Sequence, residues 1–287
     1  MKSHVVLCPN PYRDIGLSLT LKAKRLLEQN GFSVVVSPVF GTGKVIDISE
    51  ITKTMPLEEA VKGAVLVVSF GGDGTILHTA RAAITEDTPI LGVNLGSKGF
   101  MAELEPEEIE RLVDAAQGRY IPDRRMMLDV ELWREGEVVY SDSALNDAVV
   151  NGIINTINIE AYGDGRKITS FSGDGIVAAT PTGSTAYSMS AGGPLVEPAA
   201  KNIVLTPICA HFLAARAFVL APERLVEVRT GELEGKNAML SVDGNKGVEL
   251  RTGDSIHIKK SRHETLLAHV GHKSFYDIAY EKLCERT

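Results

Sequence analysis

The sequence has 287 residues, of which 44% are hydrophobic and 23% charged, and its formal net charge at pH 7 is −7. This composition is typical of a soluble globular protein and argues against a nucleic-acid partner, which would require a broad basic surface. At about 150 residues per domain, the length predicts two domains. No apolar run approaches the roughly 20 residues of a membrane span and the N-terminus lacks a secretion-signal pattern, so we expect a cytoplasmic protein without a membrane partner.

Cysteine and histidine positions indicate no metal site. The three cysteines, at positions 8, 209 and 284, are far apart and form no C-x-x-C pair, which predicts free thiols. His263, His269 and His272 lie close together, but their spacing matches no common zinc motif. We expect solvated or internally bonded histidines here and assign no metal ligand.

The first part of the chain alternates between strand and helix patterns. Short apolar runs at 4–8, 32–39, 65–70 and 89–94 predict strands, and the amphipathic stretch 17–29, ended by Asn30-Gly31, predicts a helix. Nearly continuous apolar strands separated by helices indicate a parallel sheet covered on both faces. Residues 1–124 are therefore predicted to form a doubly wound, Rossmann-like α/β domain, with ligands at the carboxyl ends of its strands.

The second part has the period of β structure. Predicted strands lie at 128–132, 138–140, 157–162, 176–180, 203–207, 225–229, 238–242 and 255–259, with a hairpin turn at 134–137. The pattern predicts a mostly antiparallel β domain over residues 125–265. The tail, residues 266–287, is predicted to return to the first domain and to contain a short helix at 274–283.

Two glycine-rich segments resemble phosphate loops but depart from the motif. The segment 41–44 reads GTGK, but Val45 replaces the Ser or Thr that a P-loop requires and Pro38 replaces its first glycine. The segment 163–167 reads GDGRK and lies between two β runs, which favours a hairpin turn. We expect ordinary loops at both places.

A third segment, VLVVSFGGDGT at 65–75, has the right context for a phosphate-binding turn, because a strand, a glycine turn and a helix follow in order. The backbone N–H groups of such a turn attract phosphate, whereas the carboxylate of Asp73 repels it. Asp73 either has a role in the chemistry or caps the helix, and the turn alone leaves both open.

Two further polar clusters lie in the β part. Residues 173–194 read GDGIVAATPTGSTAYSMSAGGP and join Asp174, a strand, a turn rich in Thr, Gly and Ser, and a predicted helix starting near Ser184 or Thr185. Hydroxyls and unpaired N–H groups of this kind suit sugar hydroxyls, amides or a pyrophosphate. Asn146 and Asp147 lie between two β runs. Together with the glycine turn, these clusters predict a cleft between the domains.

In these motifs the sequence resembles the NAD kinase family. The shared motifs are GGDGT at 71–75, the segment 92–100 ending in Gly-Phe, the Asn146-Asp147 pair, and Asp174-Gly175 followed by TPTGSTAY and GGP up to 194. GGDG alone also occurs in diacylglycerol and sphingosine kinases, whereas TPTGSTAY points to NAD kinases. The resemblance implies transfer of phosphate from ATP or polyphosphate to the adenosine ribose 2′-hydroxyl of NAD, giving NADP. It also implies a divalent metal, expected to be Mg²⁺, and a homodimer or homotetramer built through the β domain.

The resemblance implies a role for each matching residue. Asp73 would be the general base and Phe100 would stack on the adenine, while Asn146, Asp147 and Asp174 would bond ribose and nicotinamide groups. His211 and Asn245 are weaker candidates for the dinucleotide site. The remaining residues expected to contact substrate are Gly71, Gly72, Gly74, Thr75, His78, Thr182, Thr185, Ala186, Tyr187, Ser188, Met189 and Ser190.

Three positions depart from the family pattern. Asp147 stands where Glu is usual and reaches one methylene less far, and Ser172 stands where many members have an Arg that contacts phosphate. Lys98 replaces a usual Leu and is a hypothetical source of the missing positive charge.

Two other functions remain open from the residues themselves. One is a diacylglycerol-type lipid kinase, and the other is a sensor that binds NAD(H) without turnover.

Overall fold

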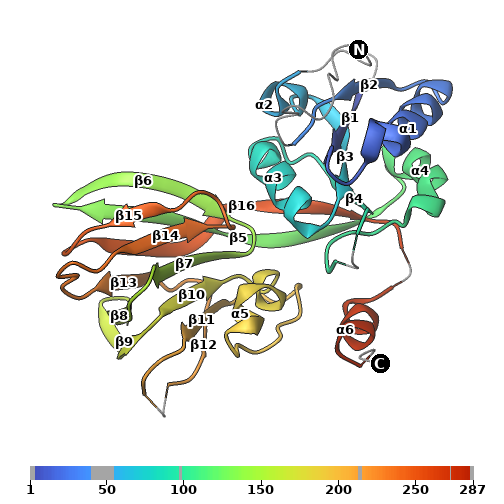
Figure 1. Ribbon diagram of the computed structural model, residues 1–287. Helices are drawn as coiled ribbons and strands as arrows, with labels where there is room; N and C mark the ends of the chain where they lie inside the picture. The colour runs from blue at the N-terminus through green and yellow to red at the C-terminus, as the bar shows by residue number, and fades with distance from the viewer. Residues whose placement is uncertain (1–3, 40–54, 97–98, 213–214, 272, 285–287) are drawn as a thin grey trace. The chain divides into compact units, whose positions relative to one another are not determined.

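The computed structural model describes residues 4–39, 55–96, 99–212, 215–271 and 273–284 (Figure 1). The chain forms two compact units, the first made of residues 1–124 with 264–287 and the second of residues 125–263. The P-loop-like segment 41–45 and Lys98 lie outside the described residues.

The first unit contains a parallel sheet with strand order β2-β1-β3-β4, and the end of β16 (Ser255–His269) joins β4 through Leu267 and Ile90. Helices α1 and α4 cover one face of this sheet, and α2 and α3 cover the other (Figure 1). The predicted doubly wound α/β fold is therefore confirmed. The elements are β1 (His4–Pro9), β2 (Ser33–Val36), β3 (Ala64–Gly71), β4 (Ile90–Asn94), α1 (Ser18–Gln29), α2 (Leu57–Ala60), α3 (Asp73–Ala83), α4 (Leu112–Ala116) and α6 (Phe275–Cys284), with 3-10 turns η1 (Ile15–Leu17) and η3 (Pro106–Arg111).

Burial explains why these strands read as continuous apolar runs. Leu7 of β1 and Leu66 and Phe70 of β3 are fully buried, because helices cover both faces of the sheet. The first turn of α1 is tied to Asp14, whose carboxylate accepts the N–H of Leu19 at 3.1 Å and of Thr20 at 2.9 Å. A carboxylate here satisfies N–H groups that lack partners within the helix.

The strand order reverses between β1 and β3, since the chain passes from β1 to β2 on one side and from β3 to β4 on the other. In doubly wound sheets, ligands bind outside the carboxyl ends of the strands at such a reversal. The glycine turn after β3 therefore lies where this fold places its ligand site.

The second unit contains two sheets, and the predicted antiparallel β domain is confirmed. In one sheet the strand order is β16-β13-β8-β9, and β5 pairs with both β16 and β6. The other sheet has the order β12-β11-β10-β7-β14-β15. The strands are β5 (Ile121–Arg134), β6 (Glu137–Ala144), β7 (Asp147–Gly152), β8 (Ile157–Gly163), β9 (Arg166–Gly173), β10 (Gly175–Ala179), β11 (Ile203–Ile208), β12 (Phe218–Leu220), β13 (Val226–Thr230), β14 (Ala238–Val242), β15 (Val248–Leu250) and β16 (Ser255–His269).

Both predicted hairpin turns are present. Glu135 and Gly136 join β5 to β6, and Asp164 and Gly165 join β8 to β9; all four residues have positive φ, from 49° to 84°. Two such residues in a row are typical of a type I′ turn. The predicted end of the last strand at 259 was wrong, because β16 continues to His269, and β9, β12 and β15 were not predicted.

The core of the second unit draws on both sheets. Leu128, Ile157 and Val228 of the first sheet pack with Ile176 and Leu205 of the second in one buried cluster. The second sheet also buries side chains in another cluster, which packs against residues of the segment after β10. The packed residues, Ala191 and Val196, follow the TPTGSTAY motif in the chain, so the sheet supports the stretch just beyond the motif. Among the described helices, none is long and apolar enough to cross a membrane.

Candidate active site

The glycine turn places Asp73 at the first position of α3. Its Oδ2 accepts the backbone N–H of Phe100 at 2.7 Å and its Oδ1 accepts that of Met101 at 3.1 Å. Gly72, in extended conformation, precedes the helix, and no side chain caps the helix start. The alternative in which Asp73 caps α3 is therefore wrong. The half-buried carboxylate is held by the loop that follows β4.

Two glycines around Asp73 are required by close packing. A Cβ at Gly71 would lie 2.1 Å from Thr75 Oγ1, and a Cβ at Gly99 would lie 2.0 Å from Asp73 Oδ1. By contrast, a Cβ at Gly72 or Gly74 would have no atom within 4 Å. The backbone of the turn is thus open at Gly72 and Gly74, where an anion can approach the first N–H groups of α3.

The end of β1 contributes a residue that the sequence patterns did not single out. The N–H of Asn10 donates to the carbonyl of Phe70 at 2.9 Å, and its side-chain amide donates to Thr75 Oγ1 at 3.4 Å. Asn10 thus ties the ends of β1 and β3 together beside Asp73. The sequence feature that could have identified Asn10 is its position directly after the apolar strand β1, one of the two strands between which the strand order reverses. His78 lies half-buried on α3, where burial lowers the pKa of its imidazole and Arg81 lowers it further.

Phe100 contacts the C-terminal helix. The ammonium of Lys282 lies 4.2 Å from the centre of the Phe100 ring, and the Phe275 ring centre lies 6.3 Å from it. One face of the ring that was expected to stack on adenine is therefore covered by α6, and a base would use the opposite face.

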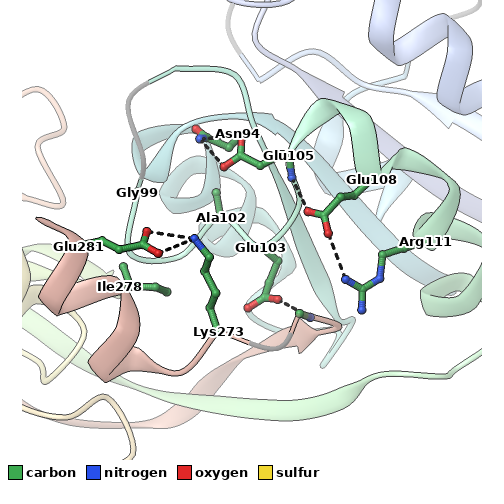
Figure 2. A pocket seen from close by; sticks show the side chains of 11 residues that line it. Asn94, Gly99, Ala102, Glu103, Glu105, Glu108, Arg111, Lys273, Ile278 and Glu281 are labelled. Carbon is green, nitrogen blue, oxygen red and sulfur yellow. Dashed lines mark hydrogen bonds and ion pairs between the residues drawn. The ribbon is translucent and has the colours of Figure 1, made fainter. Parts of the chain in front are cut away.

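A pocket of about 260 Å³ lies beside the same loop, lined by Gly99 and Glu103, by η3, and by residues before and within α6 (Figure 2). Figure 2 shows Asn94 turned toward Glu105 and Lys273 toward Glu281, and both pairs are bonded. The side-chain amide nitrogen of Asn94 donates to Glu105, whereas its buried Oδ1 has no partner among the described residues.

The histidines expected to be bonded or solvated have these surroundings. His269 pairs with Glu103, and His263 Nε2 accepts from Arg262 at 3.1 Å, while His272 lies outside the described residues. No group of three or more His, Cys, Asp or Glu in the described part of the chain is placed to hold a metal ion.

In the second unit, Asn146 and Asp147 form a corner held by Asp243. The Asp243 carboxylate accepts three backbone N–H bonds, from Leu145 at 2.7 Å, Asn146 at 2.8 Å and Asp147 at 3.0 Å. Asp243 adopts a positive φ of 49° to reach them. The sequence patterns did not assign Asp243 this role, although the Asp-Gly pair marked a turn.

Both functional side chains of this corner are buried. Asp147 is 6% exposed, and burial, followed by the nearby Asp243 carboxylate, raises its pKa to about 7. Asn146 Oδ1 is buried without a partner among the described residues. Because an unpaired buried polar atom is costly, this oxygen is a candidate to accept a hydrogen bond from a ligand.

The TPTGSTAY segment docks on this corner. Thr180 donates through Oγ1 to the Leu145 carbonyl at 2.6 Å and through its N–H to the Asn146 carbonyl at 2.8 Å. A Cβ on Gly183 would lie 2.1 Å from the Asn146 carbonyl oxygen, so only glycine fits there. The motif is thus tied by its backbone to the Asn146-Asp147 pair.

The helix predicted from Ser184 or Thr185 was wrong in form. A 3-10 turn, η4 (Gly183–Thr185), is followed by one helical turn, α5 (Tyr187–Ser190). Ala186 separates them with φ −101° and ψ −126°, which interrupts the helical hydrogen bonds.

The side chains of this segment face different surroundings. Thr182 accepts a hydrogen bond from Arg125 at 3.3 Å, and Thr185 donates to the Thr182 carbonyl at 3.0 Å. Ser188 forms a buried hydrogen bond with Thr206 at 2.9 Å. Tyr187 and Ser190 are exposed, whereas Ala186 and Met189 are half-buried. The exposed members are therefore better placed to meet a ligand than Ser188.

The remaining predicted residues lie on two turns. Asp174 is exposed between β9 and β10, and a hydrogen bond to it raises the pKa of the Cys209 thiol. The N–H of His211 donates to the Ser172 carbonyl at 2.7 Å, which puts His211 beside the strand that leads to Asp174. Asn245 follows Asp243, and its N–H donates to the Val242 carbonyl at 3.0 Å. Each unit thus carries its own polar cluster.

Two family models match this chain. The ATP-NAD kinase N-terminal domain matches residues 5–118, and the ATP-NAD kinase C-terminal domain matches residues 144–270. The chain belongs to the NAD kinase family.

Relatives and solved structures agree with this assignment. The NAD kinase of Ruminiclostridium cellulolyticum is 36% identical over 280 residues, covering 96% of each chain, and that of Acetivibrio thermocellus is 40% identical over 224 residues, covering 77% of this chain and 78% of the relative. The yeast NADH kinase complexed with NADH has a TM-score of 0.88 at 25% identity, covering 100% of this chain and 88% of its own. The NAD kinase from Archaeoglobus fulgidus in complex with ATP has a TM-score of 0.74 at 25% identity, covering 96% of both chains.

Two departures from the NAD kinase pattern lie among the described residues. Asp147, where the sequence led us to expect Glu, lies in a buried corner, and Ser172, where we expected Arg, is half-buried on β9.

Proposed function

We propose that this chain transfers the terminal phosphoryl group of ATP to the 2′-hydroxyl of the adenosine ribose of NAD, giving NADP, with Asp73 as general base. The observation that carries the proposal is the glycine turn. Two backbone N–H groups hold the Asp73 carboxylate at the carboxyl end of β3, beside the first turn of α3. Membership of the NAD kinase family supports the reaction class.

In the proposed step, the 2′-oxygen forms a bond to the γ-phosphorus of ATP while the bond from that phosphorus to the β,γ-bridging oxygen breaks. The hydroxyl proton passes to Asp73, and ADP leaves with the bridging oxygen. A carboxylate does not deprotonate a ribose hydroxyl in the ground state, so Asp73 accepts the proton as the new bond forms. The chain otherwise contributes positioning and charge stabilisation, as is usual for phosphoryl transfer.

We propose that Mg²⁺ enters on the phosphates of ATP, since Mg²⁺ usually binds through one or two carboxylates together with substrate phosphates. Each Asp73 oxygen accepts one described N–H bond, and a carboxylate oxygen has capacity for a further partner. When bound, the cation reduces the repulsion between this carboxylate and the donor phosphates.

The second unit is proposed to bind the dinucleotide. The unpaired Oδ1 of Asn146 is available to accept a hydrogen bond, and Asp147, with its pKa raised to about 7, can donate or accept near neutral pH. Asp174 and Tyr187 are exposed in the same unit and are proposed as further contacts. These groups suit ribose hydroxyls and an amide, both of which donate and accept hydrogen bonds.

A single assay tests the function. Purified protein is incubated with NAD or NADH, with ATP or inorganic polyphosphate, and with Mg²⁺, and NADP(H) is measured by a coupled dehydrogenase reaction. We expect NADP formation that depends on NAD, ATP and Mg²⁺. Binding of NAD without turnover would instead indicate a sensor, and phosphorylation of diacylglycerol vesicles without NADP formation would indicate a lipid kinase. The polyphosphate and NADH arms decide the donor and acceptor preference.

We also propose that the chain assembles as a homodimer or homotetramer, as the likeness to the family implies. Size-exclusion chromatography with light scattering measures this directly, and a monomer mass at working concentration would contradict it.

A further inference from the structure

The C-terminal helix brings a cationic side chain to the loop that holds Asp73. The Lys282 ammonium lies 4.2 Å from the centre of the Phe100 ring, and the N–H of Phe100 donates to Asp73 at 2.7 Å. A cation this close to an aromatic face is attracted by the ring quadrupole. Lys282 therefore contacts Phe100, the same residue whose backbone N–H binds the proposed base. No sequence motif had connected α6 with this site.

The chain between β16 and α6 is anchored on the same loop. Glu103 pairs with His269 and accepts the N–H of Gly271 at 2.8 Å, while Arg111 donates to the Val270 carbonyl. Glu103 lies two residues after Met101, and the N–H of Met101 also donates to Asp73. The position of α6 is therefore set by bonds to the segment that orients the base.

The start of α6 is fixed as well. Asp277 accepts the N–H of Ser274 at 2.8 Å, and the N–H of Asp277 donates to Ser274 Oγ at 3.2 Å, a reciprocal cap. Phe275 packs near Phe100, at 6.3 Å between ring centres. Lys282 lies two helical turns further along the same short helix.

The charge of Lys282 is not neutralised by a close carboxylate among the described residues. Lys273, by comparison, pairs with Glu281 at 2.8 Å, whereas no ion pair within 4.0 Å is formed by Lys282 in the described part of the chain. Burial lowers the pKa of the Lys282 ammonium, and the Asp73 carboxylate acts in the opposite direction. Lys282 is thus a half-buried cation in the electrostatic field of Asp73. Because no close carboxylate among the described residues neutralises it, its charge is available for an anionic ligand.

We propose that Lys282 binds a phosphate group of a nucleotide beside Asp73. An ammonium donates up to three hydrogen bonds and binds phosphate as a compact point charge. This inference rests on the proposed function for the identity of the ligand. The phosphate belongs either to the polyphosphate chain of ATP or to the pyrophosphate of NAD, and separate titrations distinguish them.

The test compares Lys282→Met, Lys282→Arg and the control Lys273→Met, which removes an exposed lysine that precedes α6 and pairs with Glu281. The dissociation constants of ATP with Mg²⁺ and of NAD are measured by calorimetry, and kcat and KM are measured for each substrate. We expect Lys282→Met to weaken one nucleotide about 10- to 100-fold, the effect of losing a hydrogen bond to a charged group. Lys282→Arg is expected to restore binding to within about threefold, and Lys273→Met to match the wild type.

The outcomes separate the two proposals. Loss confined to ATP assigns Lys282 to the donor, and loss confined to NAD assigns it to the acceptor. Equal affinities for both nucleotides in Lys282→Met and Lys273→Met would overturn the inference, as would failure of Lys282→Arg to recover binding. If the wild type forms no NADP, the proposed function fails, whereas the titrations still test whether Lys282 binds a nucleotide phosphate.

Discussion

Replacing Asp73 by Asn separates the chemistry of the carboxylate from its structural contacts. Asn has nearly the same shape, but one oxygen becomes an N–H donor. Both Asp73 oxygens accept a backbone N–H, at 2.7 Å from Phe100 and at 3.1 Å from Met101. In Asp73→Asn one of these bonds is lost and two donors face each other.

The two consequences have different magnitudes. A hydrogen bond to a charged group contributes about 1.5–3 kcal/mol, so the variant is expected to lose that much stability. At about 2–4 °C per kcal/mol for a chain of this size, the midpoint of thermal unfolding falls by about 3–12 °C. A general base contributes about 10²–10⁴-fold to rate, equivalent to about 3–5.5 kcal/mol of activation free energy. The rate loss is therefore too large to follow from the bond loss alone.

A buried carboxylate in the same unit provides the matched control. Asp14 is 3% exposed and likewise accepts two backbone N–H bonds, at 3.1 and 2.9 Å, at the start of α1. Asp14→Asn is expected to lose comparable stability while keeping its kcat. Thermal unfolding by fluorimetry, NAD affinity by calorimetry and kcat by the coupled NADP assay, all below the unfolding midpoints, complete the comparison.

The expected result is that Asp73→Asn keeps its NAD affinity within a few-fold and loses at least 100-fold in kcat, a loss that Asp14→Asn does not share. If Asp73→Asn kept more than about a tenth of the wild-type kcat, the assignment of Asp73 as general base would be refuted. If both variants lost kcat in proportion to stability, Asp73 would be an anchor for the loop and not a base.

Three other changes have defined outcomes. Gly183→Ala places a Cβ about 2.1 Å from the Asn146 carbonyl oxygen and should weaken NAD binding at least about tenfold by calorimetry, and unchanged affinity would contradict this packing. Burial raises the pKa of Asp147 from 3.8 to about 7, so the stability from its bound proton is complete below the unfolded value and lost as pH rises through about 7. Asp147→Asn should therefore flatten the fall in unfolding midpoint between about pH 4 and about pH 7, and an unchanged slope would contradict it. Glu103→Gln weakens the pairing with His269 and should speed hydrogen exchange in α6, which equal protection in variant and wild type would rule out.

Local patterns predicted much of the fold. Buried strands such as β1 and β3 are recognisable because both faces are covered, so their sequences are apolar throughout. The hairpin turns at 135–136 and 164–165 are recognisable because each contains a Gly, which tolerates positive φ. By contrast, the continuation of β16 to His269 depends on its partners, Ile90 of β4 among them, which no local pattern reveals.

The candidate site divides in the same way. Asp73, Asn146, Asp147 and the TPTGSTAY segment stand in motifs, because each requires particular residue types next to one another in the chain. The supporting carboxylate of Asp243 is 96 residues from the Asp147 N–H that it binds. Its role was therefore visible only in the folded chain.

For the glycine turn, the sequence by itself determined a strand, a turn open to anions, a helix, and the carboxylate of Asp73 between strand and helix. These follow from local propensities and from the small size of glycine. It left open whether Asp73 caps the helix. The tertiary structure decided against the cap, because the N–H groups that Asp73 accepts belong to Phe100 and Met101 in the loop after the next strand. It also placed Lys282, near the end of the chain, over Phe100, since hydrogen bonds and ring contacts between distant segments form only when the chain folds.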